Sequence, residues 1–125
     1  MADRKKNILI ADDNPAILDA LEIMLEEGGY AVETTLNGDA AQDMKEPFPD
    51  LLLLDIGMSG TDGRDICKLL KSGALTKNIP VVMISATKDL EQIAKDSGAD
   101  DFIAKPFQME HLLSTVARHV SSHTS

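Results

Sequence analysis

The order of apolar and polar residues divides the chain into short apolar runs separated by amphipathic segments. In the run Leu51–Leu54 four leucines follow one another without alternation, and the run stops at Asp55. An unbroken apolar run of this length is typical of a strand that is covered on both faces of a sheet. A carboxylate is costly inside such a strand, so we expect Asp55 to lie where the strand ends. Similar short runs predict four more strands, at residues 7–11, 30–36, 81–85 and 102–104.

Between these runs, apolar residues recur every three or four positions, as they do on the buried face of a helix. The pattern predicts helices at residues 15–27, 40–46, 63–71, 88–97 and 109–120. In the helix at 63–71, Ile66, Leu69 and Leu70 are expected to face inward. In the last helix the expected buried residues are Met109, Leu112, Leu113, Val116, Ala117 and Val120.

Strands that alternate with helices predict an α/β fold, here a (βα)5 doubly wound five-stranded parallel sheet. Right-handed crossovers favour the strand order 2-1-3-4-5, in which strands one and three flank the point where the order reverses. The 125 residues suffice for one domain over 1–125, and we expect flexible ends at residues 1–6 and 121–125.

Composition narrows the function classes. The net charge of −9 disfavours direct contact with nucleic acid or an anionic membrane, since both depend on cationic contacts. No apolar run is long enough to span a bilayer, and the first residues do not resemble a signal peptide. The single cysteine, Cys67, excludes an internal disulfide and fits a reducing, cytoplasmic location.

Polar residues stand at the ends of four of the predicted strands. Asp12 and Asp13 follow the first strand, Asp55 ends the third, Ser85 the fourth, and Lys105 follows the fifth. Because the carboxyl ends of parallel strands lie at one edge of the sheet, these side chains are expected to converge. Taken singly, each has a plainer explanation as a helix cap, a turn residue or a surface lysine.

Three converging carboxylates repel one another, and a hard divalent cation such as Mg²⁺ relieves that repulsion through oxygen ligands. The ammonium of Lys105 suits a phosphoryl oxygen. A carboxylate nucleophile, Mg²⁺ and a lysine together indicate phosphoryl transfer, because that chemistry depends mostly on positioning and charge neutralisation.

Five segments match, in order, the motifs of one known family. They are I-L-I-A-D-D-N at 8–14, P-D-L-L-L-L-D at 49–55, the glycines Gly60 and Gly63, V-V-M-I-S-A at 81–86, and G-A-D-D-F-I-A-K-P-F at 98–107. On these motifs the chain resembles a receiver domain of a two-component response regulator, similar to single-domain chemotaxis-type regulators. The resemblance covers essentially the whole chain and implies the flavodoxin-like receiver fold.

The resemblance implies a role for each residue at the strand ends. Asp55 resembles the phosphoacceptor, and Lys105 the residue that holds a phosphoryl oxygen. Ser85 matches the switch hydroxyl, and Phe102 the aromatic residue that turns inward when that hydroxyl moves. The peptide bond before Pro106 is commonly cis in the family.

The resemblance also implies a Mg²⁺ site. Asp13 resembles the direct ligand, with Asp12 beside it and often acting through water. Asp55 and the backbone carbonyl of Gly57 complete the implied protein ligands.

The implied phosphodonor is a histidine kinase or a histidine phosphotransfer protein, and the implied downstream target is an unknown protein. That target would read the face made by the helix at 88–97, the strand at 102–104 and the last helix. The implied state is a monomer or a phosphorylation-dependent dimer. The domain would catalyse only its own phosphorylation and autodephosphorylation, and is not expected to be an enzyme in the usual sense.

The chain departs from the family pattern at three places. Gly57 stands where a larger side chain is usual, so the rate of autodephosphorylation is open. Ser59 replaces the usual proline, which favours a looser loop. The segment between Ser85 and Gly98 is slightly shorter than usual, so the resemblance does not establish the standard output face.

Alternatives remain at this point. The chain could be the receiver portion of a hybrid histidine kinase or of a multidomain regulator. A Mg²⁺-dependent phosphatase of similar fold would need a second aspartate where Gly57 stands. A flavodoxin-like cofactor binder would need aromatic residues to sandwich the ring and a hydroxyl-rich phosphate loop after the first strand. The sequence has no Trp, and the residues after that strand, Asp12, Asp13 and Asn14, would repel a phosphate.

A few residues have plainer expectations. His111, His119 and His123 are expected at the surface with no metal to bind. Cys67 is expected to be half-buried, and Met58, near Asp55, is a candidate partner contact.

Overall fold

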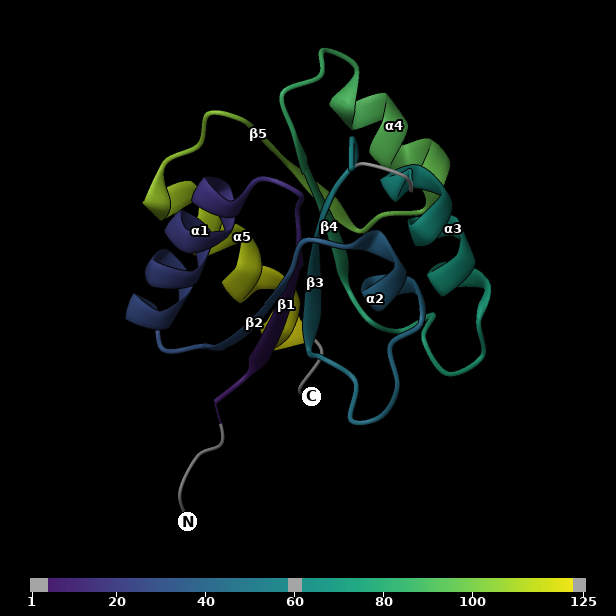
Figure 1. The fold of residues 1–125 in the computed structure, drawn as a ribbon, viewed down its shortest axis with the longest axis horizontal. Helices are drawn as coiled ribbons and strands as arrows, with labels where there is room; N and C mark the ends of the chain where they lie inside the picture. The colour runs from purple at the N-terminus through teal and green to yellow at the C-terminus, as the bar shows by residue number, and fades with distance from the viewer. Residues whose placement is uncertain (1–4, 59–61, 123–125) are drawn as a thin grey trace.

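The computed structural model describes residues 5–58 and 62–122. Five parallel strands form one sheet in the order β2-β1-β3-β4-β5, as predicted (Figure 1). The strands are β1 (Asn7–Ala11), β2 (Ala31–Thr35), β3 (Leu51–Asp55), β4 (Val81–Ser85) and β5 (Asp101–Ala104). The helices are α1 (Pro15–Glu27), α2 (Gly38–Gln42), α3 (Gly63–Ser72), α4 (Leu90–Ser97) and α5 (Met109–Ser122). In the described parts of the chain no helix is long and apolar enough to cross a bilayer.

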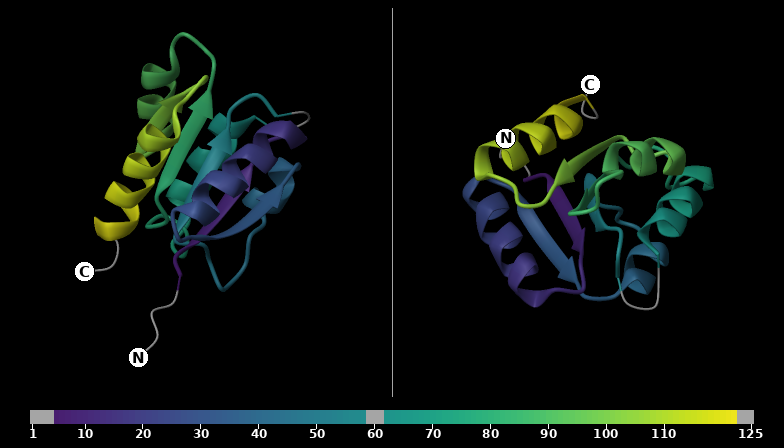
Figure 2. Two further views of the ribbon diagram at one scale, coloured as in Figure 1. Left: turned by 90° about the vertical axis from the view of Figure 1, so that its left-hand side faces the viewer. Right: turned by 90° about the horizontal axis from the view of Figure 1, so that it is seen from above.

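The sheet separates two apolar cores. Figure 2 shows α1 and α5 on one side of the sheet and α2, α3 and α4 on the other. Residues of β1, β3, β4 and β5 alternate between the two cores, as the twofold repeat of a strand requires. All five residues of β3 are buried, so this central strand is a rigid support for Asp55 at its end.

The helix starts follow the local sequence. Asn14 caps α1 and accepts hydrogen bonds from the backbone N–H groups of Ala16 and Ile17, at 3.0 and 3.4 Å, and Pro15 is the first helical residue. Asp62 caps α3 in the same way through the Arg64 N–H at 2.8 Å. These caps fix where α1 and α3 begin, and both helices begin at the carboxyl edge of the sheet.

The predicted faces of two helices were partly wrong. Leu69 is 50% exposed, whereas Cys67 is fully buried rather than half-buried. In α5, Ala117 is exposed and Thr115 is buried instead. Both differences arise from a small rotation of the helix about its axis, which periodicity alone does not determine.

α5 continues through residues 121 and 122, and the expected flexibility of both ends of the chain stays a prediction. Residues 1–4 and 123–125, together with Ser59 and Gly60, lie outside the described residues, so the expectations for them stay predictions.

Candidate functional site

Three aspartates converge at the carboxyl edge of the sheet, as predicted. Strands β1 and β3 are neighbours, and Ala11 pairs with Leu54, so the residues that follow each of them lie side by side. Carboxylate oxygens of Asp12, Asp13 and Asp55 lie within 4.8 Å of one another. These three residues and Lys105 are called the strand-exit cluster below.

Lys105 reaches the carboxylates from the far side of β4. Its Nζ lies 3.1 Å from Oδ2 of Asp12 and 3.6 Å from Oδ1 of Asp55. The ammonium therefore bonds mainly to Asp12 and only approaches Asp55. The Lys105–Pro106 peptide bond is cis, as the resemblance implies.

Asp12 is fully buried and held by the backbone on two sides. Its N–H donates to the Thr35 carbonyl at 3.1 Å, and its Oδ1 accepts from the Asn14 N–H at 2.9 Å. A buried carboxylate needs such partners. Asp12 is thus fixed in place between the end of β1 and the start of α1.

Asp55 is a buried carboxylate with a raised pKa. Burial raises its pKa, and the nearby charges of Asp12 and Asp13 raise it further. Lys105 and a hydrogen bond from the Gly57 N–H act in the opposite direction, but the pKa stays above its ordinary value. The cluster therefore holds more negative charge than its one lysine balances.

Gly63 holds α3 against the end of β3. A Cβ at this position would lie 2.3 Å from the Asp55 carbonyl oxygen and 2.9 Å from Cα of Ile56. The Gly63 N–H instead donates to the Ile56 carbonyl at 2.9 Å. The sequence signal for this contact is a glycine placed directly after the α3 cap.

Gly57 is exposed, and no heavy atom of the described residues lies within 4 Å of a Cβ built there. Space for a larger side chain is thus present beside Asp55. Its implied role as a carbonyl ligand stays a prediction.

The two implied switch residues lie on neighbouring strands, β4 and β5. Ser85 is half-buried at the end of β4, and its Oγ accepts a hydrogen bond from the Thr87 N–H at 3.2 Å. Phe102 pairs with Met83 on the edge strand β5 and packs against the core beneath α4. The structure therefore shows Ser85 in a local turn contact and not as the cap of α4, and the switch roles of both residues stay predictions.

The donor set fits Mg²⁺. Three carboxylates offer hard oxygen ligands within a small space, and a cation there would offset the charge that raises the pKa of Asp55. One or two carboxylates with waters are a usual protein contribution to a Mg²⁺ site.

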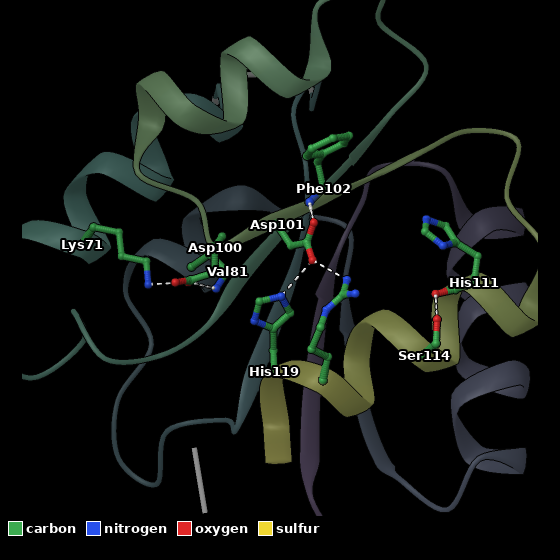
Figure 3. A network of polar contacts seen from close by, with 9 residues as sticks. Lys71, Val81, Asp100, Asp101, Phe102, His111, Ser114 and His119 are labelled. Atoms are coloured by element: carbon green, nitrogen blue, oxygen red, sulfur yellow. Dashed lines mark hydrogen bonds and ion pairs between the residues drawn. The ribbon is translucent and has the colours of Figure 1, made fainter. Parts of the chain in front are cut away.

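The sequence did not reveal a second polar network, on β5 and α5 (Figure 3). His119 was expected at the surface, but only 19% of its side chain is exposed, and its Nε2 lies 2.9 Å from Oδ2 of Asp101. Arg118 donates to the same oxygen at 2.7 Å.

Met58 was also misjudged, since it is 6% exposed and therefore offers a partner little surface.

Comparison with known proteins agrees with this geometry. The family model described as "Response regulator receiver domain" matches residues 8–117. The DNA-binding dual master transcriptional regulator RpaA of Synechocystis is 39% identical over 112 residues, which cover 87% of this chain and 46% of that protein. This chain thus spans about half the length of the curated relatives it matches.

Two solved structures share the fold closely. A putative response regulator from Chloroflexus aurantiacus has a TM-score of 0.88 at 31% identity, with 94% of this chain and 99% of that chain covered. The receiver domain of a signal transduction histidine kinase from Syntrophus aciditrophicus has a TM-score of 0.87 at 34% identity, with 95% and 92% covered.

Proposed function

The chain belongs to the response regulator receiver domain family, and from this premise we propose that Asp55 accepts a phosphoryl group from a phosphohistidine of a partner protein. The observation that carries the proposal is the strand-exit cluster. Asp55 lies at the carboxyl end of a buried strand, and two further carboxylates and one ammonium surround it. This is the set of groups that phosphoryl transfer needs.

In the proposed step an Asp55 carboxylate oxygen attacks phosphorus and forms a P–O bond. The P–N bond of the phosphohistidine breaks, and the imidazole leaves with the bonding electron pair and takes up a proton. Lys105 turns part of its contact from Asp12 toward a phosphoryl oxygen, for which its distance of 3.6 Å to Asp55 leaves it well placed.

Asp12, Asp13, Asp55 and the Gly57 carbonyl are the residues that would hold Mg²⁺. The bound ion would neutralise negative charge on the phosphoryl oxygens. The role of the chain is to keep Asp12 fixed through its two backbone partners, so that the carboxylates stay together despite their repulsion.

The phosphorylated state would be read through Ser85 and Phe102. In this proposal the Ser85 hydroxyl exchanges its Thr87 contact for the phosphoryl group, and the Phe102 ring moves inward. The face of α4, β5 and α5 would then bind a downstream protein. The domain would do so as a monomer or as a phosphorylation-dependent dimer.

The proposed setting is the cytoplasm, with a histidine kinase or a histidine phosphotransfer protein as donor. A receiver domain of this size could be part of a regulator with a DNA-binding part, like RpaA. It could equally be part of a hybrid kinase, like the Syntrophus protein. Absence of direct nucleic-acid contact by this domain stays a prediction.

Hydrolysis of the aspartyl phosphate would be the domain's only further reaction. Gly57 provides no acid or base of its own beside Asp55, which disfavours a phosphatase that acts on external esters. The open space at Gly57 leaves water access unhindered from that side.

Beryllofluoride with Mg²⁺ tests the proposal, because it mimics an aspartyl phosphate. Amide signals around the strand-exit cluster and Phe102 should shift in the wild type and stay unchanged in Asp55→Asn. Identical spectra with and without the reagent in the folded wild type would contradict the proposal.

A further inference from the structure

Asp101 begins β5 and directly precedes Phe102, and its two carboxylate oxygens have different partners. Oδ1 accepts a hydrogen bond from the Phe102 N–H at 2.8 Å. Oδ2 accepts from Nη2 of Arg118 at 2.7 Å and lies 2.9 Å from Nε2 of His119 (Figure 3). Asp101, Arg118 and His119 are called the β5–α5 clamp below.

The clamp joins the two layers of the molecule through one side chain. Ile103 packs in the core beneath α5, and Phe102 packs in the core beneath α4. Because strand side chains alternate, Asp101 lies on the α5 side with Ile103. Its carboxylate thus ties α5 to the backbone of a residue whose ring belongs to the opposite core.

The charges of the clamp are complementary. Burial acts to raise the pKa of Asp101, but the hydrogen bonds from His119, the Phe102 N–H and Arg118 outweigh it and lower that pKa. The carboxylate therefore stays ionised at neutral pH. Arg118 keeps its charge at every physiological pH.

His119 meets Asp101 from β5, and Arg118 neighbours it on α5. Asp100, next to Asp101, is held elsewhere, by Lys71 at 2.6 Å and the Val81 N–H at 2.8 Å.

The two cationic arms differ in burial. The Arg118 side chain is 61% exposed, whereas that of His119 is 19% exposed. Exposed ion pairs are strongly screened by water, so the His119 contact is the arm whose loss should be felt more.

We infer that Asp101 is a positioning residue for the proposed Phe102 switch, and that His119 is the less exposed of the two arms which hold it. The clamp keeps the start of β5 against α5 in the position seen here. Loss of the His119 contact makes the rearrangement of Phe102 easier. This inference rests on the proposed function for its consequence, but the clamp itself can be tested separately.

The first measurement follows the Phe102 amide by NMR in metal-free, unphosphorylated protein at one fixed pH. Its chemical shift should change in His119→Gln, because the Phe102 N–H donates to the carboxylate that His119 helps to hold. The matched control is His111→Gln, which removes an exposed histidine from the same helix and should behave as the wild type. A Phe102 amide with the same chemical shift in His119→Gln and in the wild type would overturn the inference.

The second measurement compares the beryllofluoride concentrations, with saturating Mg²⁺, that half-convert each variant. The wild type should need about two- to fivefold more reagent than His119→Gln. Asp101→Asn should also need less than the wild type. Equal midpoints for the wild type and His119→Gln would overturn the coupling to the switch.

The two measurements fail in distinguishable ways. No response of the wild type to beryllofluoride would contradict the proposed function and, with it, the switch role of the clamp. The Phe102 amide shift in His119→Gln would still show whether Asp101 couples His119 to Phe102.

Discussion

The strand-exit cluster and the β5–α5 clamp are opposite electrostatic designs at two places in one sheet. At the strand exits three carboxylates share one ammonium. In the clamp one carboxylate, Asp101, is shared by Arg118 and His119. Both central carboxylates are largely buried, with side-chain exposures of 10% for Asp55 and 22% for Asp101.

The difference shows that the partners decide whether the upward shift caused by burial remains or is reversed. Burial raises the pKa in both cases, yet the pKa of Asp55 is raised and that of Asp101 is lowered. In the clamp, residues of the chain itself supply the partners of the buried carboxylate. The strand-exit cluster becomes neutral only with an added cation, which is the property expected of a site that acts on a phosphoryl group.

The largest expected effect comes from breaking the support of the strand-exit cluster. Gly63→Ala places a methyl group against the Asp55 carbonyl, at a distance no real contact allows. We expect a loss of about 3 kcal/mol in the free energy of unfolding, measured by urea denaturation. Gly57→Ala is the matched control, because its site is open, and it should change stability by less than about 0.5 kcal/mol. Equal effects of the two variants would contradict the close contact.

Mg²⁺ should stabilise only the strand-exit cluster. At about 100 times its dissociation constant the ion should add about 2.7 kcal/mol to the free energy of unfolding of the wild type. Asp13→Asn should lose most of that gain, whereas Asp101→Asn should retain it. Thermal unfolding with and without the ion makes the comparison, and an unchanged gain in Asp13→Asn would argue against the assigned ligands.

Removing one negative charge should have opposite signs in the two regions. In metal-free buffer Asp55→Asn relieves repulsion and should stabilise the protein by about 0.5–2 kcal/mol. Asp101→Asn leaves Arg118 and His119 without their carboxylate partner and should destabilise the protein by roughly 1 kcal/mol. Chemical denaturation measures both changes in the free energy of unfolding. If the two variants changed it in the same direction, the contrast between the two regions would be wrong.

The pH dependence should separate the same pair with smaller effects. The folded-state pKa of Asp55 is raised, so its unfavourable contribution is present at neutral pH and fades as the pH falls through that pKa. The pKa of Asp101 is lowered, so its favourable contribution persists down to about pH 4 and is lost below.

Denaturation of the wild type and both variants across the acid range measures this difference. The advantage of Asp55→Asn should shrink by less than about 1 kcal/mol as the pH falls toward about 4, while the cost of Asp101→Asn remains. An advantage of Asp55→Asn that grows on acidification would contradict the raised pKa.

Most of the fold and the carboxylate cluster could be predicted because both depend on short patterns. Apolar runs that end at a polar residue determine the strands, and parallel pairing then brings Asp12 and Asp55 together. The preference of Lys105 for Asp12 could not be predicted, since it depends on how far a flexible side chain reaches across β4.

Features that depend on helix rotation or distant contacts were missed. Gly63, Cys67 and Leu70 share one face of α3, so the contact of Gly63 with the end of β3 turns Leu69 outward. His119 and Asp101 are 18 positions apart, and only the packing of α5 on β5 brings them together.

The central claim is that Asp55 is the residue that takes up the phosphoryl group. Intact-mass spectrometry after incubation with acetyl phosphate and Mg²⁺, followed by mapping of the modified residue, tests it most directly. The account predicts a gain of one phosphoryl group on Asp55 in the wild type and in Asp101→Asn, and none in Asp55→Asn. An unmodified wild type, or a phosphoryl group that persists in Asp55→Asn, would contradict it.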